Sequence, residues 1–272
     1  MNPATTAHRP PGSRWRSLRG SLRGSPRQAP ARPRQGFARP RQALARRWRL
    51  LRHRGDAVEC PLCGSRFSEF APDFNRWHAK CWRCGSHERH RGLWLHLQRH
   101  PELLAGVRSF LHVSPEWCLE RRLRPLIGPG YRTSELEPGR ADLALDLTAA
   151  DLPDASFDAI LCSHVLEHIP DDRAAMRELH RLVRPGGWAI VMVPIDHSRA
   201  ATYEDAAIRS AGARLEAFWQ VDHVRLYAPD IADRLAAAGF EVETARPAVE
   251  LGREAALRYG LLESDDVLVC RC

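Results

Sequence analysis

The chain has 272 residues, of which 44% are hydrophobic, and this is enough for one complete α/β domain and a small accessory unit. No apolar run has the length of a transmembrane helix, and no apolar segment near the first residue is typical of a secretory signal, so we expect neither. The formal net charge of +8 is unevenly distributed, because residues 1–54 contain fifteen arginines and no acidic residue, which leaves the remainder with a net charge of −7.

The basic segment 1–54 mixes Arg, Pro, Gly, Ser and Gln with few apolar residues. Such a composition cannot bury enough apolar surface to offset the entropy of ordering, so it predicts a disordered basic tail. The charge would suit a nucleic acid or an anionic membrane, whereas an unstructured leader or an organellar transit peptide has the same composition. A nucleic-acid partner is not favoured, because charge without a binding fold is weak evidence for one.

Four of the eight cysteines form two Cys-x-x-Cys pairs, Cys60 with Cys63 and Cys81 with Cys84, and a glycine follows each pair. Each pair presents two thiolates from one tight turn, and the 17 residues between the pairs let the two turns face each other. We therefore expect a structural site of four sulfurs in a small module over residues 55–100, with zinc as the metal and a rubredoxin-like iron as the alternative. Without an export signal, a reducing, cytoplasmic compartment is expected.

A helix is predicted over 86–100, where Pro101 ends it. Four histidines lie in this segment, and because four cysteines already complete a metal site, we expect them on the surface: His87, His90, His96 and His100.

From residue 107 onward, apolar runs alternate with amphipathic segments. Strands are expected at 107–114, 131–137, 141–147, 157–164, 188–194, 241–249 and 267–271, and helices at 115–126, 171–183 and 229–238. This alternation predicts a doubly wound α/β sheet over 101–272, with the ligand site at the carboxyl ends of the strands.

Two segments, 152–170 (LPDASFDAILCSHVLEHIP) and 176–188 (MRELHRLVRPGGW), closely resemble the middle of class I S-adenosylmethionine-dependent methyltransferases of the type 11 group. The resemblance covers roughly residues 105–272. It implies a Rossmann-like, seven-stranded sheet with a final antiparallel strand, and S-adenosylmethionine as the cofactor. It does not indicate the methyl acceptor.

The resemblance also implies roles for residues that follow the strands. Glu135 matches the acidic residue that ends the second strand, where a carboxylate would accept hydrogen bonds from both ribose hydroxyls. Asp146 and Leu147 match the pair that contacts adenine, and Ser163 and His164 end the fourth strand beside the cofactor.

The first loop departs from the family, because residues 112–117 stand where an acidic residue and a glycine-rich turn are expected. We expect Ser114 to cap the following helix, with Pro115 at its first position, so that the N-terminus of this helix receives the cofactor's carboxylate. Glu116 could pair with the cofactor's amino group.

The candidates for a general base are His164, Glu167, His168 and His223. The sequence His164-x-x-Glu167-His168 also resembles the E-x-x-E-H metal motif of some ubiquinone-pathway and small-RNA O-methyltransferases, with a histidine in place of the first glutamate. The alternative is that Glu167 and His168 only cap and orient the start of a helix.

The insert 195–228, between the fifth strand and the next helix, is expected to cover the substrate pocket. Its polar clusters favour a polar acceptor, and we expect a small or glycan-like metabolite. One alternative is an RNA methyltransferase that docks its substrate with the cysteine module and the basic tail. Another is a degenerate, non-catalytic domain, because the first loop lacks its glycines.

Overall fold

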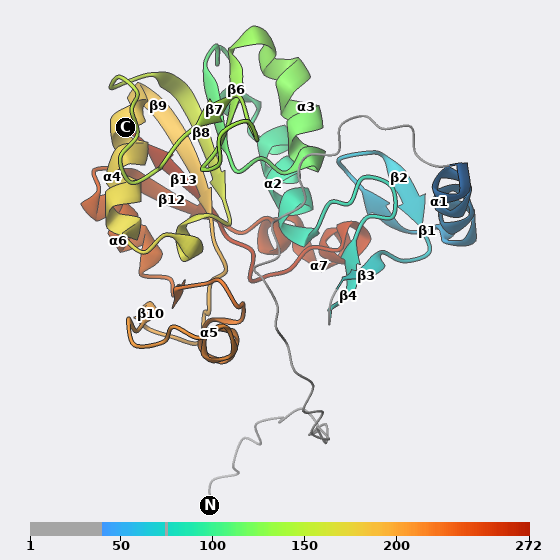
Figure 1. Ribbon diagram of the computed structural model, residues 1–272. Helices are drawn as coiled ribbons and strands as arrows, with labels where there is room; N and C mark the ends of the chain where they lie inside the picture. Colours follow the sequence, from blue (N-terminus) through green and yellow to red (C-terminus); the bar gives the residue numbers. More distant parts are fainter. Residues whose placement is uncertain (1–39, 74–75) are drawn as a thin grey trace, which may run out of the picture. The chain divides into compact units, whose positions relative to one another are not determined.

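The computed structural model of the chain describes residues 40–73 and 76–272 (Figure 1). The disorder expected for residues 1–39 lies outside the described residues. The expectation is wrong for the last part of this segment, because residues Pro40–Arg52 form helix α1 and strand β1 begins at Arg54. Apolar residues at helical spacing explain this helix, since Leu44, Trp48 and Leu51 fall on one of its faces.

The large sheet has seven strands in the order β12-β13-β9-β8-β5-β6-β7. The five strands from β5 to β9 pair in parallel, whereas β13 runs antiparallel to both of its neighbours. The strands are β5 (Phe110–Val113), β6 (Tyr131–Glu135), β7 (Leu143–Ala144), β8 (Phe157–Ser163), β9 (Val183–Met192), β12 (Glu241–Ala245) and β13 (Val267–Arg271). The predicted doubly wound, seven-stranded sheet with a final antiparallel strand is therefore confirmed.

Helices cover both faces of this sheet, as Figure 1 shows, with α4 and α6 on one face and α2 and α3 on the other. Their bounds are α2 (Glu88–Arg99), α3 (Trp117–Ile127), α4 (Asp172–Leu182) and α6 (Ile231–Ala237). Because both faces are covered, all four residues of β5 are buried, as expected for a central parallel strand. Helix α4 begins as its sequence predicts, since the side chain of Asp171 accepts a hydrogen bond from the Ala174 amide at 2.9 Å.

Several boundaries differ from the prediction, and three of the differences are large. The strand expected over 241–249 ends at Ala245, because Pro247 begins helix α7 (Pro247–Tyr259), which was not predicted. Strand β9 begins at Val183 instead of Trp188, and β7 keeps only two residues of the expected 141–147. Gly187 is required in β9, since a Cβ atom there would lie 2.6 Å from the carbonyl oxygen of Asp158.

The segment with the paired cysteines forms two antiparallel hairpins, β1 (Arg54–Cys60) with β2 (Ser65–Phe67) and β3 (Ala71–Asp73) with β4 (Arg76–Lys80). None of these short strands was predicted. Apolar side chains of this segment share one core with α2, α3 and the sheet.

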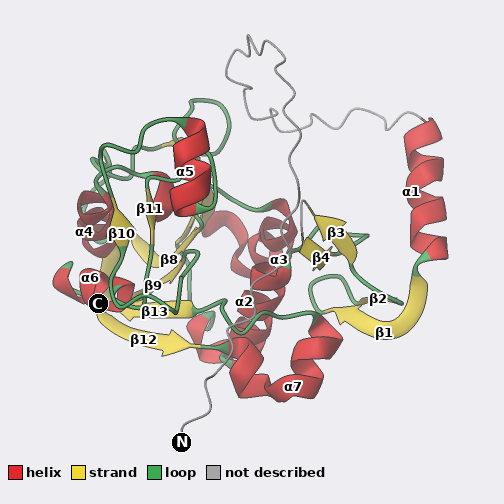
Figure 2. Ribbon diagram, turned by 90° about the horizontal axis from the view of Figure 1, so that it is seen from below, coloured by secondary structure: helices red, strands yellow, loops and turns green. Residues whose placement is uncertain are grey.

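Buried Arg91 of α2 ties this segment to α7, which packs against both α2 and β1 (Figure 2). Its guanidinium donates hydrogen bonds to the carbonyls of Ala79 and Ser86 at 3.1 and 2.9 Å. It also donates to the carbonyls of Tyr259 and Gly260, both at 2.6 Å, at the end of α7. A planar fork with five N–H donors suits this position, where a point charge could not serve four carbonyls at once.

The insert 195–228 contains β10 (Tyr203–Glu204), α5 (Ala211–Phe218) and β11 (Arg225–Leu226), and β10 pairs with β11 in an antiparallel ribbon. Single turns of 3₁₀-helix lie at Pro101–Leu103, Gly128–Gly130 and Leu166–His168. Among the described residues, no helix combines the length and the apolar character needed to cross a membrane.

Candidate functional site

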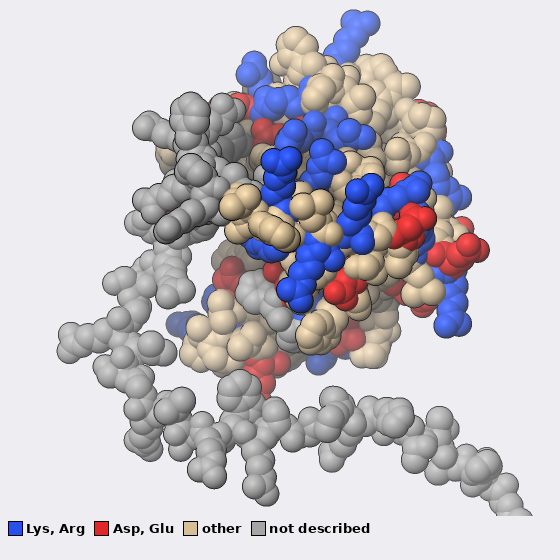
Figure 3. Space-filling view, turned by 90° about the vertical axis from the view of Figure 1, so that its right-hand side faces the viewer, with Lys and Arg blue, Asp and Glu red and all other residues tan. Residues whose placement is uncertain are grey.

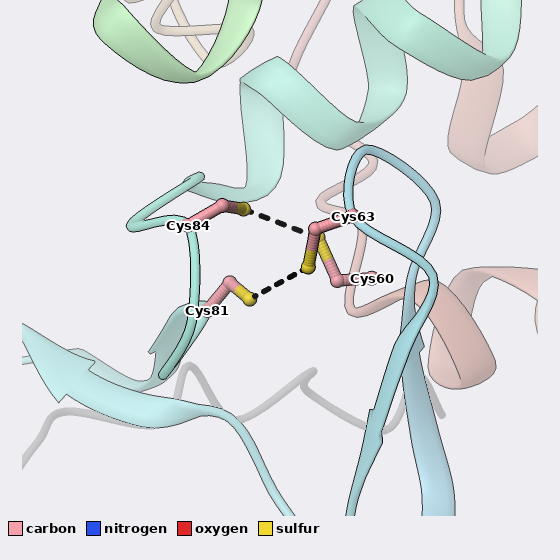
Figure 4. Close-up of side chains that lie close together, drawn as sticks. All are labelled: Cys60, Cys63, Cys81 and Cys84. Carbon is pink, nitrogen blue, oxygen red and sulfur yellow. Dashed lines mark hydrogen bonds between the residues drawn. The ribbon is translucent and has the colours of Figure 1, made fainter. Parts of the chain in front are cut away.

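The four paired cysteines come together at the tips of the two turns, with their sulfur atoms pointing toward one another (Figure 4). The Sγ atoms of Cys60 and Cys84 are 3.6 Å apart, and so are those of Cys63 and Cys81. All four sulfurs lie within 4.8 Å of one another. Four sulfurs around one zinc at about 2.3 Å would be about 3.8 Å apart, so this geometry fits a tetrahedral metal centre.

The two turns have the same backbone geometry. The amide of Gly64 donates to the carbonyl of Cys60 at 2.8 Å, and the amide of Gly85 donates to that of Cys81 at 3.0 Å. Both glycines have positive φ angles, 65° and 74°, which glycine adopts without steric cost. The hydroxyl of Ser86 lies 3.2 and 3.3 Å from two of the sulfurs, where it can donate to a thiolate.

The loop after β5 has an unusual conformation. Ser114 has a left-handed backbone with φ of 46°, a conformation that is uncommon for residues other than glycine. The prediction that Ser114 caps α3 is wrong, because the helix begins at Trp117 and its N-cap residue is Glu116. The Ser114 hydroxyl donates instead to the Glu135 carboxylate at 3.2 Å, and so joins the ends of β5 and β6.

Glu116 is held by side chains from three elements, and 16% of its side chain is exposed. The hydroxyl of Ser163, at the end of β8, donates to one carboxylate oxygen at 2.8 Å. The Nε2 atom of His112, in β5, lies 3.0 Å from the other oxygen. These contacts keep Glu116 in an extended conformation, which explains why α3 starts after it.

The expectation that the histidines of 86–100 lie on the surface is wrong for His90 and His96, which are 3% and 4% exposed. The other two histidines of this segment are half-buried. A signal for His90 was present in the sequence, since His90, Trp94 and Leu97 follow the i, i+4, i+7 spacing of one buried helix face.

His90 faces the loop after β5. Its Nδ1 accepts a hydrogen bond from the His87 amide at 3.0 Å, so the ring proton is on Nε2, which lies 3.3 Å from Glu116. Burial lowers the pKa of His90 to about 4, so the imidazole is neutral near pH 7. Burial alone would raise the pKa of the Glu116 carboxyl, but the contacts with His112 and His90 outweigh burial and hold this pKa well below its usual range. Glu116 is therefore an ionised carboxylate at the edge of the sheet.

The remaining residues that were expected to contact a cofactor lie at or after the ends of the other strands. Half-buried Glu135 ends β6, and its carbonyl accepts a hydrogen bond from the Leu145 amide at 2.9 Å. Asp146 comes next and is exposed, with one carboxylate oxygen bonded to the amide and hydroxyl of Thr148 at 2.9 and 2.7 Å. Leu147 is 5% exposed and packs into the core. The ends of β5, β6, β7 and β8 therefore present these side chains along one edge.

A second cluster contains the four candidates for a general base. His164 follows β8 in a left-handed conformation with φ of 55°, and its Nδ1 lies 3.3 Å from a carboxylate oxygen of Glu167. Glu167, His168 and His223 have potential ligand atoms that all lie within 4.8 Å of one another. The structure thus brings His223 to the motif, although it comes 55 positions after His168 in the sequence.

Buried Arg225 holds the insert in this position. Its guanidinium donates to the carbonyls of Leu166, Ile169 and Pro170 at 2.8, 2.5 and 2.7 Å. The amide of Val224 donates to the carbonyl of Glu167 at 2.9 Å. These bonds fix the backbone next to His223, and they were not predicted from the sequence.

Several polar atoms of the cluster remain without hydrogen bonds among the described residues. Both carboxylate oxygens of Glu167, which is 1% exposed, have no hydrogen-bond donor, and Nδ1 of His164 lies 3.3 Å from one of them without the geometry of a hydrogen bond. The Nδ1 of His223 lies 2.9 Å from the Phe218 carbonyl, so it carries the proton, and the unpartnered Nε2 presents its lone pair. His168 has its Nδ1 3.5 Å from Asp222. Two histidines oriented by outer oxygens and a bare carboxylate form a site suited to a cation or a proton.

Comparison with known proteins gives a family match over more than half of the chain. A family model described as a methyltransferase domain matches residues 84–245. The curated relatives include two ubiquinone biosynthesis O-methyltransferases. The one from Chromobacterium violaceum is 46% identical over 46 residues, covering 17% of this chain and 19% of the relative. The one from Pseudomonas aeruginosa (strain PAO1) is 39% identical over 60 residues, covering 21% and 25%. The chain thus spans at most about a quarter of these relatives.

Solved structures are similar over a longer part of the chain. A SAM-dependent methyltransferase from Archaeoglobus fulgidus is 14% identical, with a TM-score of 0.46, over 68% of this chain and 95% of that one. An S-adenosylmethionine-dependent methyltransferase from Mesorhizobium loti is 17% identical, with a TM-score of 0.46, over 66% of this chain and 96% of that one.

Proposed function

We propose that this chain, which belongs to the methyltransferase-domain family, is an S-adenosylmethionine-dependent methyltransferase that methylates a hydroxyl group of a polar acceptor, a small or glycan-like metabolite. The hydroxyl is supported by the names of the curated relatives, which are O-methyltransferases. The observation that carries the proposal is the buried carboxylate of Glu167, which has no hydrogen-bond donor among the described residues and lies beside two histidines.

The cofactor would lie across the carboxyl ends of the parallel strands. The residues proposed to bind it are Ser114, Glu116, Glu135, Asp146, Leu147 and Ser163. The ionised Glu116 would pair with the cofactor's amino group, and Glu135 would accept hydrogen bonds from the ribose hydroxyls. The Ser114 hydroxyl, already bonded to Glu135, would keep that carboxylate in place.

The residues proposed to act on the acceptor are His164, Glu167, His168 and His223. The methyl group would pass from the cofactor's sulfonium to the acceptor oxygen, while the proton of that oxygen moves to Glu167 or a neighbouring imidazole. The products are a methyl ether, S-adenosylhomocysteine and a protonated side chain.

A divalent cation also fits this cluster. Glu167, His168 and His223 offer one carboxylate and two imidazoles within 4.8 Å of one another, and outer oxygens orient both rings. A bound cation would lower the pKa of the acceptor hydroxyl. The proton of the acceptor hydroxyl would then be transferred more easily to His164, whose side chain is partly exposed.

The test combines cation binding with turnover. After chelation, Mn²⁺ titration followed by electron paramagnetic resonance should give one site in the wild type, weakened at least tenfold in Glu167→Gln. Glu216→Gln, an exposed glutamate of the same insert, is the control and should bind as the wild type does. If none of the proteins binds Mn²⁺ and only Glu167→Gln loses turnover, the result would support Glu167 as a general base that acts without a cation. Equal turnover in both variants would overturn the assignment of the cluster.

We also propose that Cys60, Cys63, Cys81 and Cys84 bind one structural zinc ion and make residues 55–100 a zinc module. The distances between the sulfurs support this proposal. A reducing, cytoplasmic setting belongs to the same proposal, because cysteines that bind a metal have to stay reduced. Metal analysis should give about one zinc per chain. One iron instead would indicate a rubredoxin-like centre, and a folded, metal-free protein would overturn the proposal.

A further inference from the structure

Helix α1 presents a stripe of large apolar side chains to solvent. Leu44, Trp48 and Leu51 follow the i, i+4, i+7 spacing, and they are 58%, 67% and 59% exposed. Three such side chains on one face of a 13-residue helix form a contiguous apolar surface. Exposed apolar surfaces of this kind mark sites of interaction, whereas single exposed apolar residues do not.

The opposite face of the helix joins it to the rest of the protein. Leu50 packs against the core that contains the paired cysteines and α2. Directly after the helix, the ring of His53 stacks on that of Trp82 with centroids 4.1 Å apart. The apolar stripe therefore faces away from the side that is attached.

The charge around the stripe has one sign. At 3.6 residues per turn, Arg47 and Arg52 fall on either side of the stripe, and Arg49 falls further round the helix. The helix has no acidic residue, and neither does the rest of the segment 1–54. Figure 3, in which the α1 side of the molecule faces the viewer, shows many Lys and Arg side chains over this face, with tan side chains between them and Asp and Glu side chains beside them.

We propose that α1 docks on anionic phospholipid bilayers, with its axis along the surface. The stripe would insert at the boundary between headgroups and acyl chains, where Trp and Leu are favoured, and the arginines would contact lipid phosphates. Arginine suits this position because its stem covers apolar surface while its head stays at the phosphates. A nucleic acid would match the arginines but leave the apolar stripe in water, so the bilayer fits both features.

The test uses the full chain and vesicles of two compositions, phosphatidylcholine alone and phosphatidylcholine with about a third phosphatidylglycerol. In co-sedimentation, the wild type should bind the anionic vesicles and bind the neutral ones much more weakly. Trp48→Ser should weaken binding about tenfold, because one large side chain no longer leaves water. Arg47→Gln combined with Arg52→Gln should also weaken it, and added salt should do the same.

Trp219→Ser is the matched control, because Trp219 is 51% exposed but lies outside α1. It should bind as the wild type does. Unchanged binding of Trp48→Ser would show that the arginine-rich segment acts as a simple polycation, and would overturn the proposal. The same holds if the control loses as much binding as Trp48→Ser, or if an RNA oligonucleotide depends on Trp48 as strongly as the anionic vesicles do.

Discussion

The Nε2 atom of His90 lies 3.3 Å from a carboxylate oxygen of Glu116, so the helix that follows the paired cysteines touches the loop that follows the first strand of the sheet. Cys118, in the first turn of α3, adds a second contact, with its sulfur 3.3 Å from Nδ1 of His90. The paired cysteines are therefore connected to the proposed cofactor edge through one imidazole. A change at the paired cysteines should therefore alter the proposed cofactor edge, and a change at that edge should alter the cysteine site.

Loss of the proposed metal should weaken cofactor binding. Cys84→Ser removes one of the four sulfurs, loosens the turn before α2 and so releases His90 from Glu116. We expect metal loss and, where the protein still folds, at least a fivefold weaker affinity for S-adenosylmethionine, measured by calorimetry. Cys272→Ser is the control, because that thiol is exposed and outside the cluster. Unchanged affinity in a metal-free, folded variant would contradict this coupling.

The buried imidazole of His90 should make stability depend on pH. Its pKa is lowered by burial from 6.5 to about 4, so between these values the unfolded chain binds more protons than the folded one. The neutral His90 therefore contributes to the free energy of unfolding. This contribution is complete above pH 6.5 and is lost as the pH falls toward 4, with an upper limit of about 3 kcal/mol. His90→Gln should lose less stability than the wild type between pH 7 and 4.5, as measured by denaturant unfolding.

The control for this comparison is His78→Gln, which changes an exposed histidine and should follow the wild-type pH profile. Metal content has to be measured at each pH, because thiolate protonation also releases metal. Parallel pH profiles for His90→Gln and the wild type would argue against a neutral, buried His90.

Removal of the Glu135 carboxylate should weaken binding of S-adenosylmethionine by roughly thirtyfold or more. Two charge-assisted hydrogen bonds to the ribose would be lost, at a cost on the order of 2–4 kcal/mol. Glu135→Gln should do less harm than Glu135→Ala, because the amide keeps one acceptor oxygen. Glu137→Ala, two residues later and 66% exposed, should bind as the wild type does in the same titration. Equal affinities in all four proteins would refute the ribose contact.

Replacement of Arg225 should release the insert from the second cluster. Arg225→Lys replaces the two terminal nitrogens that reach the three carbonyls with a single nitrogen on a different stem, which cannot reproduce the geometry of the planar guanidinium, so we expect destabilisation of about 3 kcal/mol. Because His223 loses its fixed backbone, the Mn²⁺ affinity should fall as well, whereas the zinc content should not. Arg209→Lys, an exposed change in the same insert, tests whether any arginine there matters. Destabilisation without a change in Mn²⁺ affinity would mean that Arg225 only supports the fold.

The parallel sheet could be predicted from the sequence, because buried strands such as Phe110–Val113 appear as continuous apolar runs. The ends of the elements were predicted less accurately, because single residues determine where an element begins or ends. Pro247, for example, starts a helix within an expected strand. The short hairpins around the paired cysteines were missed because they contain few apolar residues and depend on packing against α2.

The proposed sites could be predicted only where their residues are close in sequence. His164, Glu167 and His168 are neighbours on one turn, but the approach of His223 depends on Arg225 and three distant carbonyls. The partners of Glu116 are histidines four and 26 residues earlier and a serine 47 residues later. Such contacts arise from the paths of β5 and β8, so no local pattern contains them.

The bonds of Arg91 have a consequence for the order of events during synthesis. The guanidinium reaches carbonyls 168 and 169 residues further along the chain, at Tyr259 and Gly260. The paired cysteines are synthesised long before these acceptors, so the segment could bind the proposed zinc ion early but could not complete its attachment to α7. Until residues 259 and 260 have been synthesised and α7 has folded, the guanidinium lacks two of its four acceptors, and the nascent chain exposes the apolar surface that α7 later covers.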